Sequence, residues 1–116
     1  MIKPAIVVVG YNRPKSLKRL LTSVGNAVYK YDDITLIISL DKSGIEDVTV
    51  VAEEFKWDHG EKIVRTFETR QGLKQHILQC GDLSEVYGAV IILEDDLFVA
   101  KDFYNFTVDA LNYYAE

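Results

Sequence analysis

Three consecutive acidic residues near the end of the sequence have the types and spacing of metal ligands. Glu94, Asp95 and Asp96, called here the acidic cluster, directly follow the apolar residues 89–93, Ala-Val-Ile-Ile-Leu. Mg²⁺ and Mn²⁺ prefer oxygen ligands, and their usual site combines one or two carboxylates with substrate phosphates. We therefore predict that the acidic cluster holds a divalent cation, Mn²⁺ or Mg²⁺, and through it a nucleotide diphosphate.

The three acids are not expected to be equivalent. In an extended chain Glu94 and Asp96 project to one side and Asp95 projects to the other. The turn after the first apolar run, residues 10–14, lacks the glycines of a phosphate-binding fingerprint, and no Walker A lysine pattern is present. A metal ion is therefore the expected phosphate holder. The alternative is an acidic loop that only caps the following helix.

Two more polar residues end predicted strands. Asp41 follows the apolar residues 34–40, on the edge that is predicted to carry the acidic cluster. A carboxylate there can accept hydrogen bonds from a base or a ribose hydroxyl, whereas the first position of an Asx-turn is the ordinary alternative. Arg13 closes the turn after residues 5–9, where it either contacts a base or phosphate or is a solvated residue at a helix start.

Gly72 lies between the third predicted strand and its helix, with Arg70, Lys74 and His76 nearby. A glycine at this point either lets the backbone approach a ligand closely or forms a simple turn. Neither of the two histidines has a partner at a recognisable metal-ligand spacing. We therefore expect no histidine among the metal ligands.

Apolar runs alternate with helical patterns along the chain, and these elements position the polar residues. The strands are predicted at residues 5–9, 34–40, 62–67 and 89–93, and the helices at 14–28, 45–55, 73–80 with a continuation or restart to 86, and 103–114. The expected apolar helix faces include Val28, Leu73, Cys80, Phe106 and Tyr114. Four βα units predict a Rossmann-like α/β fold with a parallel, doubly wound sheet and right-handed crossovers.

Composition narrows the class of protein. A length of 116 residues with 48% hydrophobic residues predicts one ordered domain, residues 1–116. The net charge of −5 argues against nucleic acid or an anionic membrane as a partner. Cys80 is the single cysteine, which excludes an internal disulfide and a thiolate metal cluster. Since no stretch resembles a membrane span or a signal peptide, a cytoplasmic location is expected.

Three segments together resemble the nucleotide-sugar-binding half of GT-A fold glycosyltransferases. The closest likeness is to the N-acetylglucosaminyltransferase I type, and a looser one is to the family 2 group. Residues 90–104 resemble a Glu-Asp-Asp-Leu motif followed by Val-Ala-x-Asp-Phe-Phe, which is that family's form of the metal-binding Asp-x-Asp. Residues 8–14 resemble its first strand and turn, and residues 38–41 its second strand.

The resemblance implies metal-dependent transfer of a sugar from a nucleotide diphosphate sugar, expected to be a UDP-sugar, to a hydroxyl of a glycan, lipid-linked or protein acceptor with inversion. Asp96 resembles the direct metal ligand. Glu94 and Asp95 resemble acids that contact the sugar or ribose and support the metal shell. Asp41 resembles the acid that reads uracil, and Arg13 the arginine that contacts the base.

Arg70, Lys74 and His76 lie where the family places further nucleotide contacts, in a segment that departs from the usual pattern. Enzymes of this fold continue into an acceptor-binding half that carries the general base. We expect that half to lie outside this chain, because no candidate base is found in it. A non-catalytic nucleotide- or partner-binding module of the same fold therefore stays open as an alternative.

A phosphoryl-accepting signalling or phosphatase domain is a further alternative with a similar topology. Such domains place their key aspartates directly after the first strand. This sequence has Tyr11, Asn12 and Arg13 at that point, which argues against this class.

Overall fold

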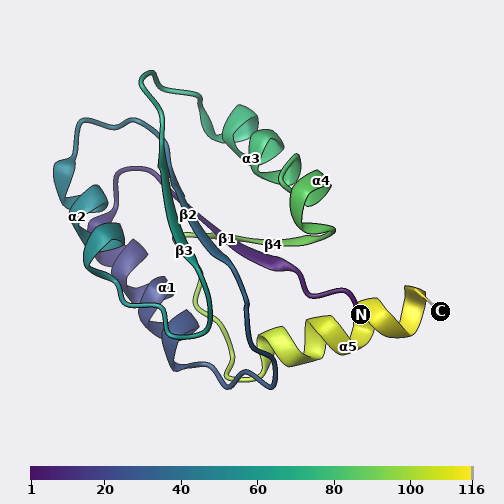
Figure 1. Cartoon of the computed structure of the whole chain (residues 1–116). Helices are drawn as coiled ribbons and strands as arrows, with labels where there is room; N and C mark the ends of the chain where they lie inside the picture. Colours follow the sequence, from purple (N-terminus) through teal and green to yellow (C-terminus); the bar gives the residue numbers. More distant parts are fainter. Residues whose placement is uncertain (116) are drawn as a thin grey trace.

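A four-stranded sheet, with the strand order β3-β2-β1-β4 and every pair parallel, forms the centre of the computed structural model (Figure 1). The structure describes the backbone of residues 1–115 and the side chains of residues 1–113. The elements are β1 (Ala5–Gly10), α1 (Pro14–Asn26), β2 (Leu36–Leu40), α2 (Glu46–Glu54), β3 (Lys62–Thr66), α3 (Leu73–Gly81), α4 (Ser84–Tyr87), β4 (Val90–Glu94) and α5 (Phe103–Ala115). The predicted alternation of strands and helices is confirmed.

Helices cover both faces of the sheet, as the prediction of a doubly wound fold requires. Because alternate strand residues point to opposite faces, Ile6 and Val8 pack with α1, α2 and α5 in the larger core cluster, whereas Val7 and Val9 pack with α3 and α4 in the smaller one. Figure 1 shows α1 and α2 on one side of the sheet and α3 and α4 on the other. Within residues 1–115, no helix is long and apolar enough to cross a bilayer.

The acid-tipped strand β4 is covered on both faces, as expected, but less fully than the central strands: Ile91 and Leu93 pack with the larger core cluster, and Val90 and Ile92 pack with the smaller one. β1 and β2 are buried along their whole length, because they lie in the middle of the sheet. β4 is an edge strand beside β1, and all its residues except Leu93 are half-buried. An unbroken apolar run therefore does not distinguish a central strand from an edge strand.

The start of β2 and the end of α1 differ from the prediction, because backbone groups at these points bond to loops instead of continuing the element. β2 begins at Leu36 and not at Ile34, whose amide donates to the carbonyl of His59 at 2.8 Å. α1 ends at Asn26, so Val28 lies beyond the helix and is 58% exposed. The Val28 amide donates to the carbonyl of Lys101 at 2.7 Å, which directs the chain away from the helical path.

The buried face of α5 also differs from the expected one. Phe106 is 73% exposed, whereas Tyr104 and Val108 are completely buried. Tyr104 can be buried because its hydroxyl donates to the Pro4 carbonyl at 2.7 Å, which satisfies its polar atom. Tyr114, expected on the same face as Phe106, lies outside the residues whose side chains the structure describes.

The predicted apolar face of α3 is wrong at its first position. Leu73 is 62% exposed, and the side chains that α3 buries are His76 and Cys80. The expected burial of Cys80 is confirmed. The helical pattern restarts after α3 as the short helix α4, which was one of the two predicted courses.

Gly60 precedes β3 at a point where two backbone segments touch. A Cβ atom on Gly60 would lie 2.3 Å from the Ile34 carbonyl oxygen, and its φ of 155° is unusual for other residues. We expect Gly60→Ala to lower the free energy of unfolding by about 2 to 4 kcal/mol, because overpacking adds to backbone strain. Denaturant unfolding at equilibrium measures this loss.

The matched control is Gly81→Ala at the end of α3, where a Cβ meets nothing within 4 Å. This variant should unfold at the same denaturant concentration or be stabilised by up to about 1 kcal/mol, because alanine has the higher helix propensity. Equal stability of the two variants would contradict the close approach at Gly60.

Candidate functional site

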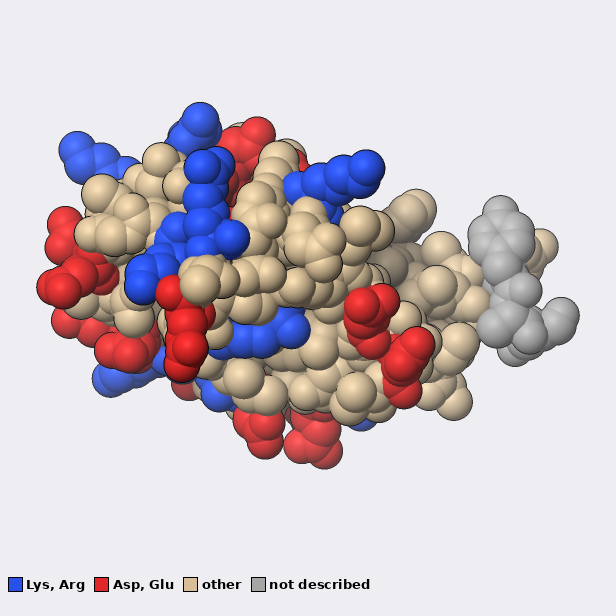
Figure 2. Space-filling view, turned by 90° about the horizontal axis from the view of Figure 1, so that it is seen from above, with Lys and Arg blue, Asp and Glu red and all other residues tan. Residues whose placement is uncertain are grey.

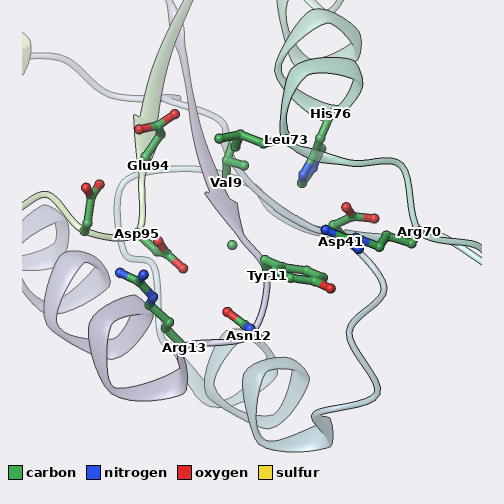
Figure 3. Close-up of a pocket in the computed structure, with 12 residues that line it drawn as sticks. Val9, Tyr11, Asn12, Arg13, Asp41, Arg70, Leu73, His76, Glu94 and Asp95 are labelled. Atoms are coloured by element: carbon green, nitrogen blue, oxygen red, sulfur yellow. The ribbon is translucent and has the colours of Figure 1, made fainter.

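A cavity of about 250 Å³ opens at the carboxyl ends of β1, β2 and β4 (Figure 3). The turn after β1, the residue after β2, the acidic cluster after β4 and the start of α3 form its wall. The carboxyl ends of parallel strands meet at one edge of a sheet, which is the usual place for ligands in this kind of fold. The cavity lies at the edge where the sequence placed the site.

Most of the predicted site residues meet in this cavity. Those that line it are Arg13, Asp41, Arg70, His76, Glu94, Asp95 and Asp96. Lys74 is exposed on α3 and is not among the lining residues. The structure therefore brings the predicted acids and arginines together but does not bring Lys74 to them.

The chain leaves its extended conformation within the acidic cluster. β4 ends at Glu94, and the chain then turns, with the Leu97 amide donating to the Glu94 carbonyl at 3.1 Å. All three acids are among the residues that line the cavity, and Figure 3 shows the side chains of Glu94 and Asp95 directed to different sides. Glu94 and Asp95 are half-buried, while Asp96 is exposed.

The cavity wall carries four carboxylates and only two guanidinium groups. Burial raises the pKa of Asp95; Arg13 opposes this shift, Asp96 adds to it, and the Tyr11 amide opposes it. Figure 3 shows Arg13 and Asp95 on the same side of the cavity. On the face of the molecule that Figure 2 shows, acidic and basic side chains are interspersed. The cavity wall thus has an excess of negative charge, as the whole chain does with its net charge of −5.

The donor atoms of the cavity suit a hard cation as part of its coordination shell. Carboxylate oxygens of the acidic cluster are the atoms that Mg²⁺ and Mn²⁺ prefer. Within the described part of the chain, no group of three or more His, Cys, Asp or Glu side chains forms a site that could hold a metal ion. A cation here would therefore need ligand oxygens, such as phosphates, in addition to those of the protein.

Asp41 ties the end of β2 to the loop before α3. Its Oδ1 accepts hydrogen bonds from the amides of Lys42 and Gln71, both at 2.8 Å, and its Oδ2 accepts one from Gly72 at 3.0 Å. Burial would raise the pKa of Asp41, but these amides outweigh it and hold the pKa below its ordinary value of 3.8. The local hydrogen bond goes to the next residue and not to the second one, as an Asx-turn would require. Asp41 therefore bridges to the loop before α3, and it is also among the residues that line the cavity.

Arg70, a predicted nucleotide contact, forms a wall of the cavity together with Tyr11, which was not predicted. The Arg70 guanidinium lies over the Tyr11 ring, 5.1 Å from its centroid, at cation–π distance. Such a flat, cationic wall suits an aromatic or anionic ligand. Tyr11 follows the end of β1, so its place at the carboxyl edge was the available signal.

His76 is buried at 1% exposure, although it was not among the residues of the predicted apolar face. Its Nε2 lies 2.7 Å from the Ser39 hydroxyl, which satisfies a ring nitrogen inside the protein. Burial lowers the pKa of His76, Asp41 opposes this shift and Arg65 adds to it. The ring is therefore held in its neutral form at the base of the cavity.

A family model described as glycosyl transferase family 2 matches residues 5–113. The chain belongs to glycosyl transferase family 2. The predicted resemblance to family 2 is thereby confirmed, and the match spans every strand of the sheet and every residue of the cavity. A comparison of this chain with curated proteins found no significant match.

Solved structures support the same assignment at the level of the fold. The crystal structure of S. aureus TarS has a TM-score of 0.71 at 16% identity, covering 94% of this chain and 19% of TarS. A TarS structure of residues 1–349 gives 0.67 at 14% identity, and its complex with UDP gives 0.68 at 14%; both cover 94% of this chain and 32% of the other. This family 2 chain thus spans less than a third of the solved chains that it matches.

Proposed function

We propose that this chain is the donor-binding part of a metal-dependent glycosyltransferase that uses a UDP-sugar. The observation that carries the proposal is the charge of the cavity at the carboxyl ends of the strands, with four carboxylates against two arginines. A nucleotide diphosphate would be repelled by this wall unless a divalent cation bound with it. Membership of glycosyl transferase family 2 and the TarS complex with UDP support a nucleotide-sugar donor.

The cation would be held by Asp96, the exposed member of the acidic cluster, together with phosphate oxygens of the donor. Its chemistry would be to neutralise the departing diphosphate. Glu94 and Asp95 would contact the sugar or ribose from the half-buried end of the cluster. Arg13, beside Asp95 at the start of α1, would contact the base or a phosphate.

The nucleobase of the donor would lie between the Tyr11–Arg70 wall and the Asp41–His76 side of the cavity. The Asp41 carboxylate has about four lone-pair positions and uses three of them on backbone amides, which leaves one for a ligand donor such as a base N–H. Lys74 lies away from the cavity wall, and its predicted contact with the nucleotide would require that side chain to reach across the start of α3.

The proposed reaction is an inverting transfer. An acceptor hydroxyl attacks the anomeric carbon on the face opposite the leaving diphosphate. The new glycosidic bond forms as the bond to the diphosphate breaks, and the hydroxyl proton passes to a general base. The proposal assigns the role of general base to no residue of the described cavity.

Removing the metal tests the proposal directly. Titration calorimetry with UDP should show an affinity at least about tenfold higher in Mn²⁺ than in EDTA, because the acids repel the free diphosphate and anchor the metal complex. Mg²⁺ should substitute at least in part, since it prefers the same oxygen ligands. Equal UDP affinity with and without a divalent cation would refute the metal role.

A non-catalytic nucleotide-binding module of the same fold is the alternative. Family 2 membership and the shared cavity are compatible with both. Hydrolysis of a UDP-sugar, or its transfer to an added acceptor, by a protein that includes the downstream sequence distinguishes the two. Metal-dependent binding without any turnover in that longer protein would favour the module.

A further inference from the structure

The half-buried Arg65 and the buried Ser39 and His76, from three different elements, form a hydrogen-bonded chain behind the cavity. Arg65 on β3 donates from Nε to the Ser39 hydroxyl on β2 at 3.0 Å. The Ser39 hydroxyl in turn lies 2.7 Å from Nε2 of His76 on α3. Ser39 is completely buried, so water does not compete for its hydroxyl group.

The proton positions in this chain follow from what each group can donate and accept. Arginine only donates, whereas a serine hydroxyl has one proton and two lone pairs. Arg65 occupies a lone pair of the Ser39 oxygen, and the hydroxyl proton then needs an acceptor. The stronger acceptor within reach of this proton is His76 Nε2. The other is the Cys80 sulfur, a weak acceptor that already accepts a hydrogen bond from Arg65 Nη2 at 3.3 Å.

The ring of His76 is fixed in orientation as well as in protonation. The ring of Phe67 packs edge-on against it, with centroids 5.3 Å apart and an interplanar angle of 80°. The Arg65 guanidinium lies over the Phe67 ring, 5.2 Å from its centroid. Arg65 and Phe67 therefore hold each other and the imidazole in one arrangement.

The second ring nitrogen, Nδ1, is free to serve a ligand. His76 lines the cavity, and Nδ1 has no hydrogen-bond partner among residues 1–115. In the described part of the chain, the buried side-chain polar atom without a partner is Gln79 Oε1, so Nδ1 is not enclosed. Figure 3 shows the ring of His76 directed into the cavity beside Asp41.

We propose that Arg65 and Ser39 are positioning residues that hold His76 in its neutral Nδ1–H form, so that the cavity presents a fixed hydrogen-bond donor next to the acceptor Asp41. This inference rests on the proposed function. Uracil offers a carbonyl oxygen beside a ring N–H, which complements a donor beside an acceptor. Cytosine offers an amino group beside an unprotonated nitrogen, which places donor against donor and acceptor against acceptor.

The first test needs no substitution at the site. Long-range proton–nitrogen correlation spectra of the wild-type protein resolve the tautomer of each histidine, and the sequence has only His59 and His76. A His59→Gln variant assigns the two signals. Near neutral pH, His76 should show a protonated Nδ1 and an unprotonated Nε2. A protonated Nε2, or a doubly protonated ring, would overturn the inference.

The second test links the proton position to nucleotide selectivity. Ser39→Ala should give His76 a mixture of tautomers and reduce the preference for UDP over CDP by about five- to tenfold, the value of one hydrogen bond. Ser39→Thr keeps the hydroxyl and should restore both properties. Ser84→Ala, a matched change on α4 under the same face of the sheet, should alter neither.

The two proposals fail in different ways. If the wild-type protein shows the Nδ1–H tautomer but binds no UDP with Mn²⁺, the proposed function is wrong and so is the role of His76 in reading uracil. If UDP binds with Mn²⁺ but His76 carries its proton on Nε2, only the present inference is overturned. Unchanged selectivity in a folded Ser39→Ala protein would also overturn it.

Discussion

Replacing Asp96 with alanine is expected to lower the affinity for UDP in Mn²⁺ by about 100-fold, the usual order for a group that anchors a metal or its phosphate. Asp96 is the exposed member of the acidic cluster, at the mouth of a cavity that already carries three other carboxylates. Its removal should therefore abolish the difference between Mn²⁺ and EDTA. Calorimetric titration of UDP under both conditions measures the effect.

Asp82→Ala is the matched control for net charge. Asp82 is an exposed aspartate at the end of α3, and its loss changes the formal net charge of −5 by the same one unit. This control should keep the wild-type response to Mn²⁺. If Asp96→Ala keeps that response as well, another member of the cluster holds the cation. If both variants lose it, the effect is one of overall charge.

The strands and the location of the cavity could be predicted from the sequence because they depend on local patterns. β1 and β2 are unbroken apolar runs, and each ends in a polar turn. Once the strands are parallel, their carboxyl ends must share an edge, which is why Arg13, Asp41 and the acidic cluster could be placed together. This step needed topology but no knowledge of side-chain packing.

The burial of His76 on α3 could not be predicted, because it depends on a partner that is distant in the sequence. Leu73 is the more apolar residue, yet His76 takes the buried position because Ser39, thirty-seven positions earlier in the chain, bonds to its ring. A serine inside an apolar strand gives no sign of which helix residue it will meet. The same holds for Arg65, which reads as an ordinary charged residue of the weakest strand.

The turn within the acidic cluster could not be predicted from the sequence for a simpler reason. An alternating pattern applies only while the chain stays extended, and β4 ends at Glu94. The turn that follows brings Asp95 and Asp96 to the same cavity. Strand ends are decided by one or two residues, and here that difference decides which carboxylates can act together.

Asp41→Asn is expected to cost about 2 to 3 kcal/mol of stability. The substitution replaces a carboxylate oxygen, which accepts hydrogen bonds from backbone N–H groups, with an amide NH₂ group, which can only donate. Three amides depend on the two oxygens of Asp41, and two of these amides belong to Gln71 and Gly72 in the loop before α3. The variant should therefore loosen that loop. Denaturant unfolding measures the loss, and Asp58→Asn on an exposed loop is the matched control.

The cost should depend on pH in a defined direction. The amides hold the pKa of Asp41 below its ordinary value of 3.8 in the folded protein. A lowered folded-state pKa contributes stability that is fully present above the unfolded value and is lost as pH falls through the folded one. The difference between wild type and Asp41→Asn should therefore shrink between about pH 5 and about pH 3. A constant difference over this range would contradict the shift.

Gly72→Ala separates the loop role of Asp41 from its proposed contact with the base. Gly72 has φ of 82° and ψ of 153°, a combination that is essentially restricted to glycine, and a Cβ there meets nothing within 4 Å. The substitution strains the loop by about 1 to 3 kcal/mol but leaves the carboxylate in place. If Asp41 contacts the base, Asp41→Asn should weaken UDP binding well beyond Gly72→Ala. Equal losses of affinity would mean that Asp41 acts through the loop alone.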